Sequence, residues 1–330
     1  MQFQFDSQVK DEFLARNGWA DAAQSAIGDD WALRRFFRLS RGNETAILMQ
    51  SVPDDDPRAT RGHKLGDFIT ISKYLRGLGL KAPRVYAEDI ANGLMIVEDF
   101  GDISLHEVFL SDDAALETYY LKATDILIEL YQKTTANTLD LKNYFDGHIH
   151  AARRFIVDYY LPTITKEAAN DEMVVRYLAV WDDIEKTLPP VAFRFIHADY
   201  HPHNLMITEG EIGLIDFQGA LWGPAPYDLV NLLEDARRLV PADIKHACKA
   251  RYLAALPENE REGFEAWYIV LAAQFHCRVI GQAIKLAGEG KPRLLDYVPV
   301  LESHLKQDLQ SPILRPLAMF LADSGLDFAA

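Results

Sequence analysis

The hydrophobic pattern of this chain changes character near residue 101, and that change limits the folds open to it. Before residue 101, short apolar runs typical of strands alternate with turn residues; they cover 33–40, 45–52, 84–89 and 93–101. The turn RGNE between the first two runs and the turn at 91–93 between the last two each predict a hairpin. Helical patterns are expected at 9–26 and 64–78. The sequence therefore predicts a small α+β unit in the first hundred residues.

Longer helical patterns dominate the rest of the chain. Apolar residues recur at three- and four-residue spacing over 113–135, 148–160, 171–187, 226–239, 243–255, 261–287 and 294–309. The strand-like exceptions are 194–197, 205–208 and 212–217. We expect an N-terminal domain over 1–101 and a mostly helical domain over 102–330, divided at the turn 98–103.

The charge balance and the apolar runs exclude several classes of partner. The chain has 49 acidic and 34 basic residues, a net charge of −15, and no Lys/Arg-rich run, so a nucleic-acid partner is not expected. No apolar run approaches the length of a spanning helix, and the first residues lack the pattern of a signal peptide. No membrane partner is therefore expected. Cys248 and Cys277 are far apart and fall in helical patterns, which indicates buried free thiols and a cytoplasmic location. The sequence does not predict an oligomeric state.

Residues 197–204, HADYHPHN, carry three histidines and an aspartate. Such side chains suit zinc, but Pro202 excludes a central strand, and a spacing of two residues diverges on a helix. Zinc is therefore the weaker reading of this run. The plainer alternative is that the histidines are loop residues that contact backbone groups, and we assign His203 to it.

The next residues give the run a different meaning. The segment NLMITEGEIGLIDFQ reads as a hairpin whose two strands bring Asn204 near Asp216. An amide oxygen and a carboxylate form a hard-oxygen site that suits Mg²⁺. Asp199 precedes Asn204 on the loop and can accept a proton from a substrate hydroxyl. Three such groups in this order predict phosphoryl transfer.

HADYHPHN resembles the H-x-D-x-x-x-x-N catalytic loop of the aminoglycoside phosphotransferase and choline-kinase-like superfamily, and IDFQ stands where protein kinases have D-F-G. The resemblance implies a bilobal protein-kinase-like fold, with a small β-rich N-lobe and a larger, mostly helical C-lobe, and an ATP- and Mg²⁺-dependent small-molecule kinase. It implies Asp199 as the catalytic base, Asn204 and Asp216 as metal ligands, and His197 as a support of the loop.

A second motif, VEDFGD at 97–102, is similar to the hinge of the same superfamily. This similarity implies that main-chain groups of Glu98, Asp99 and Phe100 meet the adenine ring.

Finer resemblance covers nearly the whole chain. Segments such as AILMQSVPDD, LGLKAPRVYAED, DFQGALWGPAPYDLVNLLEDARR and AAQFHCRVIGQAIKLA are similar to the anomeric amino-sugar kinases of cell-wall recycling. This subgroup implies phosphorylation of N-acetylmuramic acid or N-acetylglucosamine at the C1 hydroxyl. The alternatives are a kinase of another small-molecule hydroxyl (an aminoglycoside, choline or a different sugar) and a nucleotide-binding pseudokinase that acts as a scaffold.

The chain departs from the kinase pattern at the phosphate cation. Met49 stands about where a strand lysine is expected. Arg34, Arg35 and Arg38 on the preceding strand are the replacement candidates, and we choose Arg35. The glycine-rich loop is reduced to IGDDWA, in which Gly28 to Ala32 would form the phosphate-covering turn.

Residues for the acceptor are the least defined part of the sequence. Asp228 opens a predicted helix, where a carboxylate satisfies backbone donors and favours the dipole, and it is expected also to brace the catalytic loop. Tyr227 and Trp222 either stack on a sugar or fill the core. The candidate substrate contacts are His201, Glu234, Asp235 and Arg237.

Overall fold

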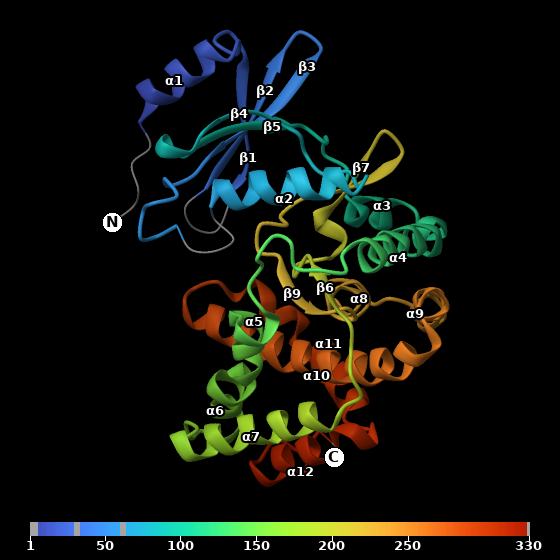
Figure 1. Cartoon of the computed structure of the whole chain (residues 1–330). Coiled ribbons are helices and arrows are strands. Elements are labelled where there is room, and N and C mark those ends of the chain that lie inside the picture. Colours follow the sequence, from blue (N-terminus) through green and yellow to red (C-terminus); the bar gives the residue numbers. More distant parts are fainter. Residues whose placement is uncertain (1–5, 30–33, 60–63, 329–330) are drawn as a thin grey trace. The chain divides into compact units, whose positions relative to one another are not determined.

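The computed structural model describes residues 6–29, 34–59 and 64–328 (Figure 1). By compactness the chain divides into two units. The first unit holds Met1–Ala123 and Asp199–Ala220, and the second holds Thr124–Ala198 and Leu221–Ala330. Compactness thus places 102–123 and 199–220 with the N-terminal residues, so a functional boundary at 101 stays a prediction.

A five-stranded antiparallel sheet in the order β1-β2-β3-β5-β4 forms the first part of the first unit. Its strands are β1 (Ala23–Asp29), β2 (Arg35–Arg41), β3 (Glu44–Gln50), β4 (Val85–Asp89) and β5 (Leu94–Glu98). Both predicted hairpins are confirmed. The second one turns at Gly93, where φ is 67° and a Cβ would lie 2.0 Å from the Ser51 carbonyl oxygen, so the turn requires glycine.

Two helices accompany this sheet. Helix α1 (Ser7–Arg16) begins at Asp6, whose carboxylate accepts hydrogen bonds from two backbone amides of the first turn. Phe13 and Leu14 of α1 pack with Leu39, Leu48 and Ile96 of the sheet in one buried cluster. Helix α2 (Leu65–Gly77) confirms the helix expected at 64–78.

The helix predicted at 9–26 is wrong in its second half. It ends at Arg16, and Ala23–Asp29 forms strand β1, which pairs with β2 from Ala23 opposite Ser40. The stretch 23–29 has no period-2 alternation, so its strand character comes from the backbone partners that β2 offers.

The first unit also contains the hairpin expected after Asn204. A 3₁₀ turn at Pro202–Asn204 leads into β7 (Leu205–Thr208), which pairs with β8 (Glu211–Leu214) in the register Leu205 opposite Leu214. Helix α3 (Leu105–Ser111) starts at a capping box of Ser104 and Glu107, and Ser104 also forms an isolated bridge to Met206 of β7.

The second unit is mainly helical, and its small sheet pairs β6 (Phe193–Ile196) with β9 (Leu221–Pro224), a strand that was not predicted. Helix α4 (Leu116–Lys133) leads into this unit. Its other helices are α5 (His148–Ala151), α6 (Leu161–Thr165), α7 (Asp171–Thr187), α8 (Tyr227–Leu233), α9 (Ala242–Ala255), α10 (Glu258–Gly288), α11 (Val298–Asp308) and α12 (Arg315–Asp323).

Two helix predictions in this unit are wrong in extent. The helix expected at 226–239 ends at Leu233, because the Asp235 carboxylate then accepts the Arg237 amide in a local turn that competes with a helical bond. The helix expected at 148–160 is interrupted by a 3₁₀ turn at Ala152–Arg154 and a π turn at Ile156–Tyr160. Here α10 approaches closely: a Cβ on Gly281 would lie 2.1 Å from the Phe155 carbonyl oxygen.

Among the described residues, no helix combines the length and apolarity needed to cross a membrane. Cys248 and Cys277 are buried free thiols, as predicted.

Candidate active site

The predicted catalytic residues lie where strand β6 gives way to an irregular loop. Asp199 follows Ala198, whose φ of 72° reverses the chain direction after the strand. Its carboxylate is 56% exposed, whereas Tyr200 beside it is fully buried and donates its hydroxyl to the Ala123 carbonyl oxygen at 2.8 Å. The loop therefore presents Asp199 to solvent from a firmly held backbone.

Asn204 and His201 hold the Asp199 carboxylate from two sides. The Asn204 amide nitrogen donates to Asp199 Oδ2 and to the Asp199 carbonyl oxygen, both at 3.0 Å. His201 Nε2 lies 3.2 Å from Asp199 Oδ1, and its ring is buried. Because the Asn204 nitrogen is committed to Asp199, its amide oxygen remains available as a metal ligand.

Asp216 follows β8 in a left-handed conformation, with φ 58°. Ile215 donates its backbone amide to the Asn204 carbonyl oxygen at 3.1 Å, so the hairpin brings Asn204 and Asp216 together as predicted. Phe217, the next residue, is fully buried and packs on Phe68 of α2 with ring centroids 4.9 Å apart. This contact fixes the point from which the Asp216 side chain projects.

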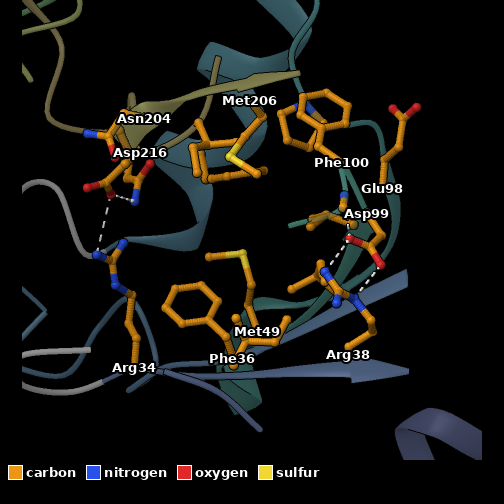
Figure 2. A pocket seen from close by; sticks show the side chains of 18 residues that line it. Arg34, Phe36, Arg38, Met49, Glu98, Asp99, Phe100, Asn204, Met206 and Asp216 are labelled. Carbon is orange, nitrogen blue, oxygen red and sulfur yellow. Dashed lines mark hydrogen bonds and ion pairs between the residues drawn. The ribbon is translucent and has the colours of Figure 1, made fainter. Parts of the chain in front are cut away.

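The first unit contains a cavity of about 390 Å³. Asn204 and Asp216 line one end of it, and Glu98, Asp99 and Phe100 line the other (Figure 2). Apolar side chains of Phe36, Met49 and Met206 line the space between these ends. The volume and the apolar lining with a few polar groups are typical of a small-molecule site. A slot of this kind suits a flat ring with a charged tail at the metal-ligand end.

The acidic side chains at the hinge end are occupied by other partners. Glu98 accepts the Arg84 amide at 3.0 Å, and Asp99 accepts two hydrogen bonds from Arg38, at 2.7 and 3.1 Å. The bond to Asp99 raises the pKa of Arg38. Phe100 packs so closely on β8 that a Cβ on Gly213 would lie 2.5 Å from its ring. The Glu98 backbone amide is engaged as well, since it donates to the Arg84 carbonyl oxygen at 2.8 Å. An adenine contact by main-chain groups of 98–100 therefore stays a prediction.

Arg34, directly before β2, and Arg35, the first residue of β2, differ in their position relative to the cavity. Arg34 lines the cavity, with Nη2 3.5 Å from Asp216 Oδ1 (Figure 2). Arg35, the predicted phosphate cation, is exposed and is not among the lining residues, because neighbouring residues of a strand point to opposite faces. Met49, the residue found about where a strand lysine was expected, also lines the cavity.

Of two further positions, Gly28 was predicted from the sequence as part of the site and Gln218 was missed. Gly28 lies in strand β1, and the rest of its proposed phosphate-covering turn, 30–32, falls outside the described residues. Gln218 was missed: it lines the cavity and donates its amide to Asp216 Oδ1 at 3.0 Å. Its place two residues after a motif aspartate is the signal that could have drawn attention to it.

Asp228 supports the chain just before Asp199. It is 2% exposed, and its carboxylate accepts the His197 amide at 2.6 Å and the Ala198 amide at 3.0 Å. His197 itself is fully buried. Both residues belong to the second unit. Asp228 thus holds the backbone before Asp199, whereas no side chain in the described part of the chain caps the start of α8, and the supporting role of the His197 side chain stays a prediction.

The candidate acceptor contacts of the second unit are already engaged. Arg237 pairs with Asp235 at 2.8 Å, and Glu234 pairs with Lys245 at 2.5 Å. Tyr227 is 1% exposed and packs on Tyr144, which favours the core reading for this aromatic residue.

The zinc reading of the histidine run finds no support in the geometry. Among the described residues, the run does not bring three ligand atoms together. His203 instead stacks on His106, with ring centroids 3.9 Å apart and planes at 19°.

Known proteins with similar sequences cover nearly the whole chain. The family model described as "Phosphotransferase enzyme family" matches residues 23–268. The N-acetylmuramate/N-acetylglucosamine kinase of Caulobacter vibrioides is 31% identical over 94% of both chains. The enzyme of the same name from Pseudomonas aeruginosa is 28% identical over 96% of this chain and 94% of its own.

Solved structures agree on the fold. Choline kinase LicA from Streptococcus pneumoniae is 13% identical, covers 91% of this chain with all of its own, and has a TM-score of 0.63. A ternary complex of a thermostable aminoglycoside phosphotransferase mutant is 14% identical, covers 93% of this chain with 99% of its own, and has a TM-score of 0.58. The predicted α+β protein-kinase-like fold is confirmed. The chain belongs to the phosphotransferase enzyme family and is a small-molecule kinase.

Proposed function

We propose that this enzyme transfers the γ-phosphoryl group of ATP, with Mg²⁺, to the anomeric C1 hydroxyl of N-acetylmuramic acid or N-acetylglucosamine. The observation that carries the phosphotransfer part is Asn204, which donates to Asp199 and lies beside Asp216 at one end of an apolar cavity. The acceptor is inferred from the curated relatives, which are named as kinases of these two sugars.

In the proposed reaction, Asp199 accepts the proton of the C1 hydroxyl while that oxygen attacks the γ-phosphorus. The new C1–O–P bond forms as the bond between the γ-phosphorus and its bridging oxygen breaks, and ADP leaves. Asn204 Oδ1 and the Asp216 carboxylate would hold Mg²⁺, which would neutralise phosphate charge. Asn204 and His201 keep the base oriented.

The cavity supports the assignments for adenine and for the phosphate cation, whereas those of Gly28 and of the sugar contacts rest on the sequence. Main-chain groups of Glu98–Phe100 would meet the adenine ring, and Gly28 keeps its proposed role near the phosphates. We assign the phosphate cation to Arg34 instead of Arg35, because Arg34 reaches the Asp216 end of the cavity. Asp235 and Arg237 remain proposed sugar contacts, with Arg237 as the cation for the lactyl carboxylate of N-acetylmuramate.

A substrate panel tests the proposal. ADP release should require N-acetylmuramate or N-acetylglucosamine, and NMR of the product should show phosphorus coupled to the anomeric proton. ADP release with choline or an aminoglycoside alone would establish a rival acceptor. ATP binding without turnover on any compound would favour the scaffold alternative.

Arg34→Ala is expected to lower kcat/KM for ATP by about 10- to 100-fold, because a charge-assisted contact to phosphate contributes about 1.5–3 kcal/mol. Arg35→Ala is the matched control and should stay within about twofold of wild type, since an exposed arginine off the cavity contributes little. Steady-state kinetics at saturating sugar would measure both. The reverse ranking would return the assignment to Arg35.

A further inference from the structure

Three ligand-type side chains converge in the second unit. Glu234 follows the last residue of α8, His276 lies in α10, and His304 lies in α11. One ligand atom from each lies within 4.8 Å of the other two. Helices α8 and α11 both pack against α10, so the cluster sits where three elements of one unit meet (Figure 1).

His276 presents an unused nitrogen at this point. The side chain is fully buried, and its Nδ1 lies 2.6 Å from the Asp308 carboxylate. With Nδ1 directed at Asp308, Nε2 is the ring nitrogen left for a further partner. Nε2 is buried without a hydrogen-bond partner, a costly arrangement that calls for a ligand.

His304 repeats the pattern from the neighbouring helix. Its Nδ1 is also buried without a hydrogen-bond partner, and its ring centroid lies 5.2 Å from that of His276. Burial and the neighbouring His276 lower the pKa of His304 to about 4.

Glu234 supplies the negative charge of the cluster. It is 8% exposed, accepts the Tyr268 hydroxyl at 2.7 Å and pairs with Lys245. Burial raises the pKa of Glu234, but the adjacent Lys245 acts against this, and the pKa is lowered overall. Each carboxylate oxygen has a second lone pair for a further partner.

The lysines near the cluster do not cancel its charge. Lys245 pairs with the Glu234 carboxylate, and its charge also acts on the Asp308 carboxylate. Lys249 also faces Glu234 and Asp308, but burial lowers its pKa. The two carboxylates, Glu234 and Asp308, therefore favour a dication at the cluster.

We propose that Glu234, His276 and His304 bind a divalent transition metal ion, Zn²⁺ by the chemistry of the ligands, with Asp308 orienting His276 from behind. Two imidazoles and one carboxylate form a known type of zinc set, which leaves a fourth position for water. Small rotations of the side chains would close the present separations to metal–ligand distances. The ion would tie α8, α10 and α11 together. The proposal does not rest on the phosphotransfer reaction, although Glu234 directly precedes the proposed sugar contact Asp235.

The test uses the full chain, stripped with a chelator and titrated with ZnCl₂ alone. We expect one zinc per chain to survive dialysis, with a Kd of about 1 µM or tighter, and the Tm to rise by about 5 °C at excess zinc. His276→Ala and His304→Ala should each lose this zinc and the Tm rise. His246→Ala, an exposed histidine on α9, should keep both.

Asp216→Ala distinguishes the cluster from the cavity. This variant should keep the zinc if the ion binds at the cluster and should be the only variant to lose it if the ion binds at Asp216. Circular dichroism of each metal-free variant checks that it is folded. If an alanine variant is not folded, His304→Gln is used in its place. Zinc retained by both histidine variants would overturn the proposal. So would absence of uptake by wild type, which would identify the cluster as a buried ion-pair network only.

Discussion

Asp199→Asn is expected to lower kcat for sugar phosphorylation by about 10²- to 10⁴-fold, the usual contribution of a positioned general base. The amide nearly preserves the shape of the carboxylate but cannot accept the proton of the hydroxyl. ATP affinity should change little, because Asp199 lies outside the set of residues that line the cavity. ADP release would give kcat, and calorimetry with a non-hydrolysable ATP analogue would give the affinity.

Asp55→Asn is the matched control, since Asp55 is an exposed aspartate of the same unit. It should retain the wild-type kcat. An Asp199→Asn enzyme with wild-type turnover would show that the base has been assigned to the wrong residue. A fall in ATP affinity of the same size as the fall in kcat would instead place Asp199 among the nucleotide contacts.

The catalytic loop and its hairpin were predictable because the interactions that form them are local. Asn204 reaches Asp199 only five residues away, and Ile215 bonds to Asn204 through a tight hairpin. Sequence spacing alone therefore predicted that Asn204 and Asp216 meet. Helix α7, which has a strongly amphipathic pattern, was found at its predicted ends, and α9 was found within one residue of its own.

Features that depend on distant partners were not predictable in the same way. Strand β1 carries no alternating pattern and depends on β2 for its backbone partners. The choice between Arg34 and Arg35 depends on where β2 begins relative to the cavity, and a shift of one residue reverses which side chain faces it. The cluster of Glu234, His276 and His304 joins three helices without any spacing motif, so only the packing of those helices reveals it.

Asp228→Ala is expected to lower the free energy of unfolding by about 3 kcal/mol, because it leaves two buried backbone amides without an acceptor. The carboxylate is 2% exposed and accepts the amides of His197 and Ala198. Ala198 has a φ of 72°, a strained conformation for a residue with a side chain, and these bonds help to hold it. Urea denaturation would measure the loss.

The same substitution should reduce kcat, because Ala198 directly precedes Asp199 and a relaxed φ would redirect the base. Asp228→Asn, which keeps one acceptor oxygen, should lose less stability and less activity than Asp228→Ala. Asp243→Ala, an exposed acid in the first turn of α9, is the control and should cost less than about 1 kcal/mol. A folded Asp228→Ala enzyme with wild-type kcat would show that Asp228 serves stability alone. A parallel fall in the free energy of unfolding and in kcat would show that the strained turn and the orientation of Asp199 depend on one buried carboxylate.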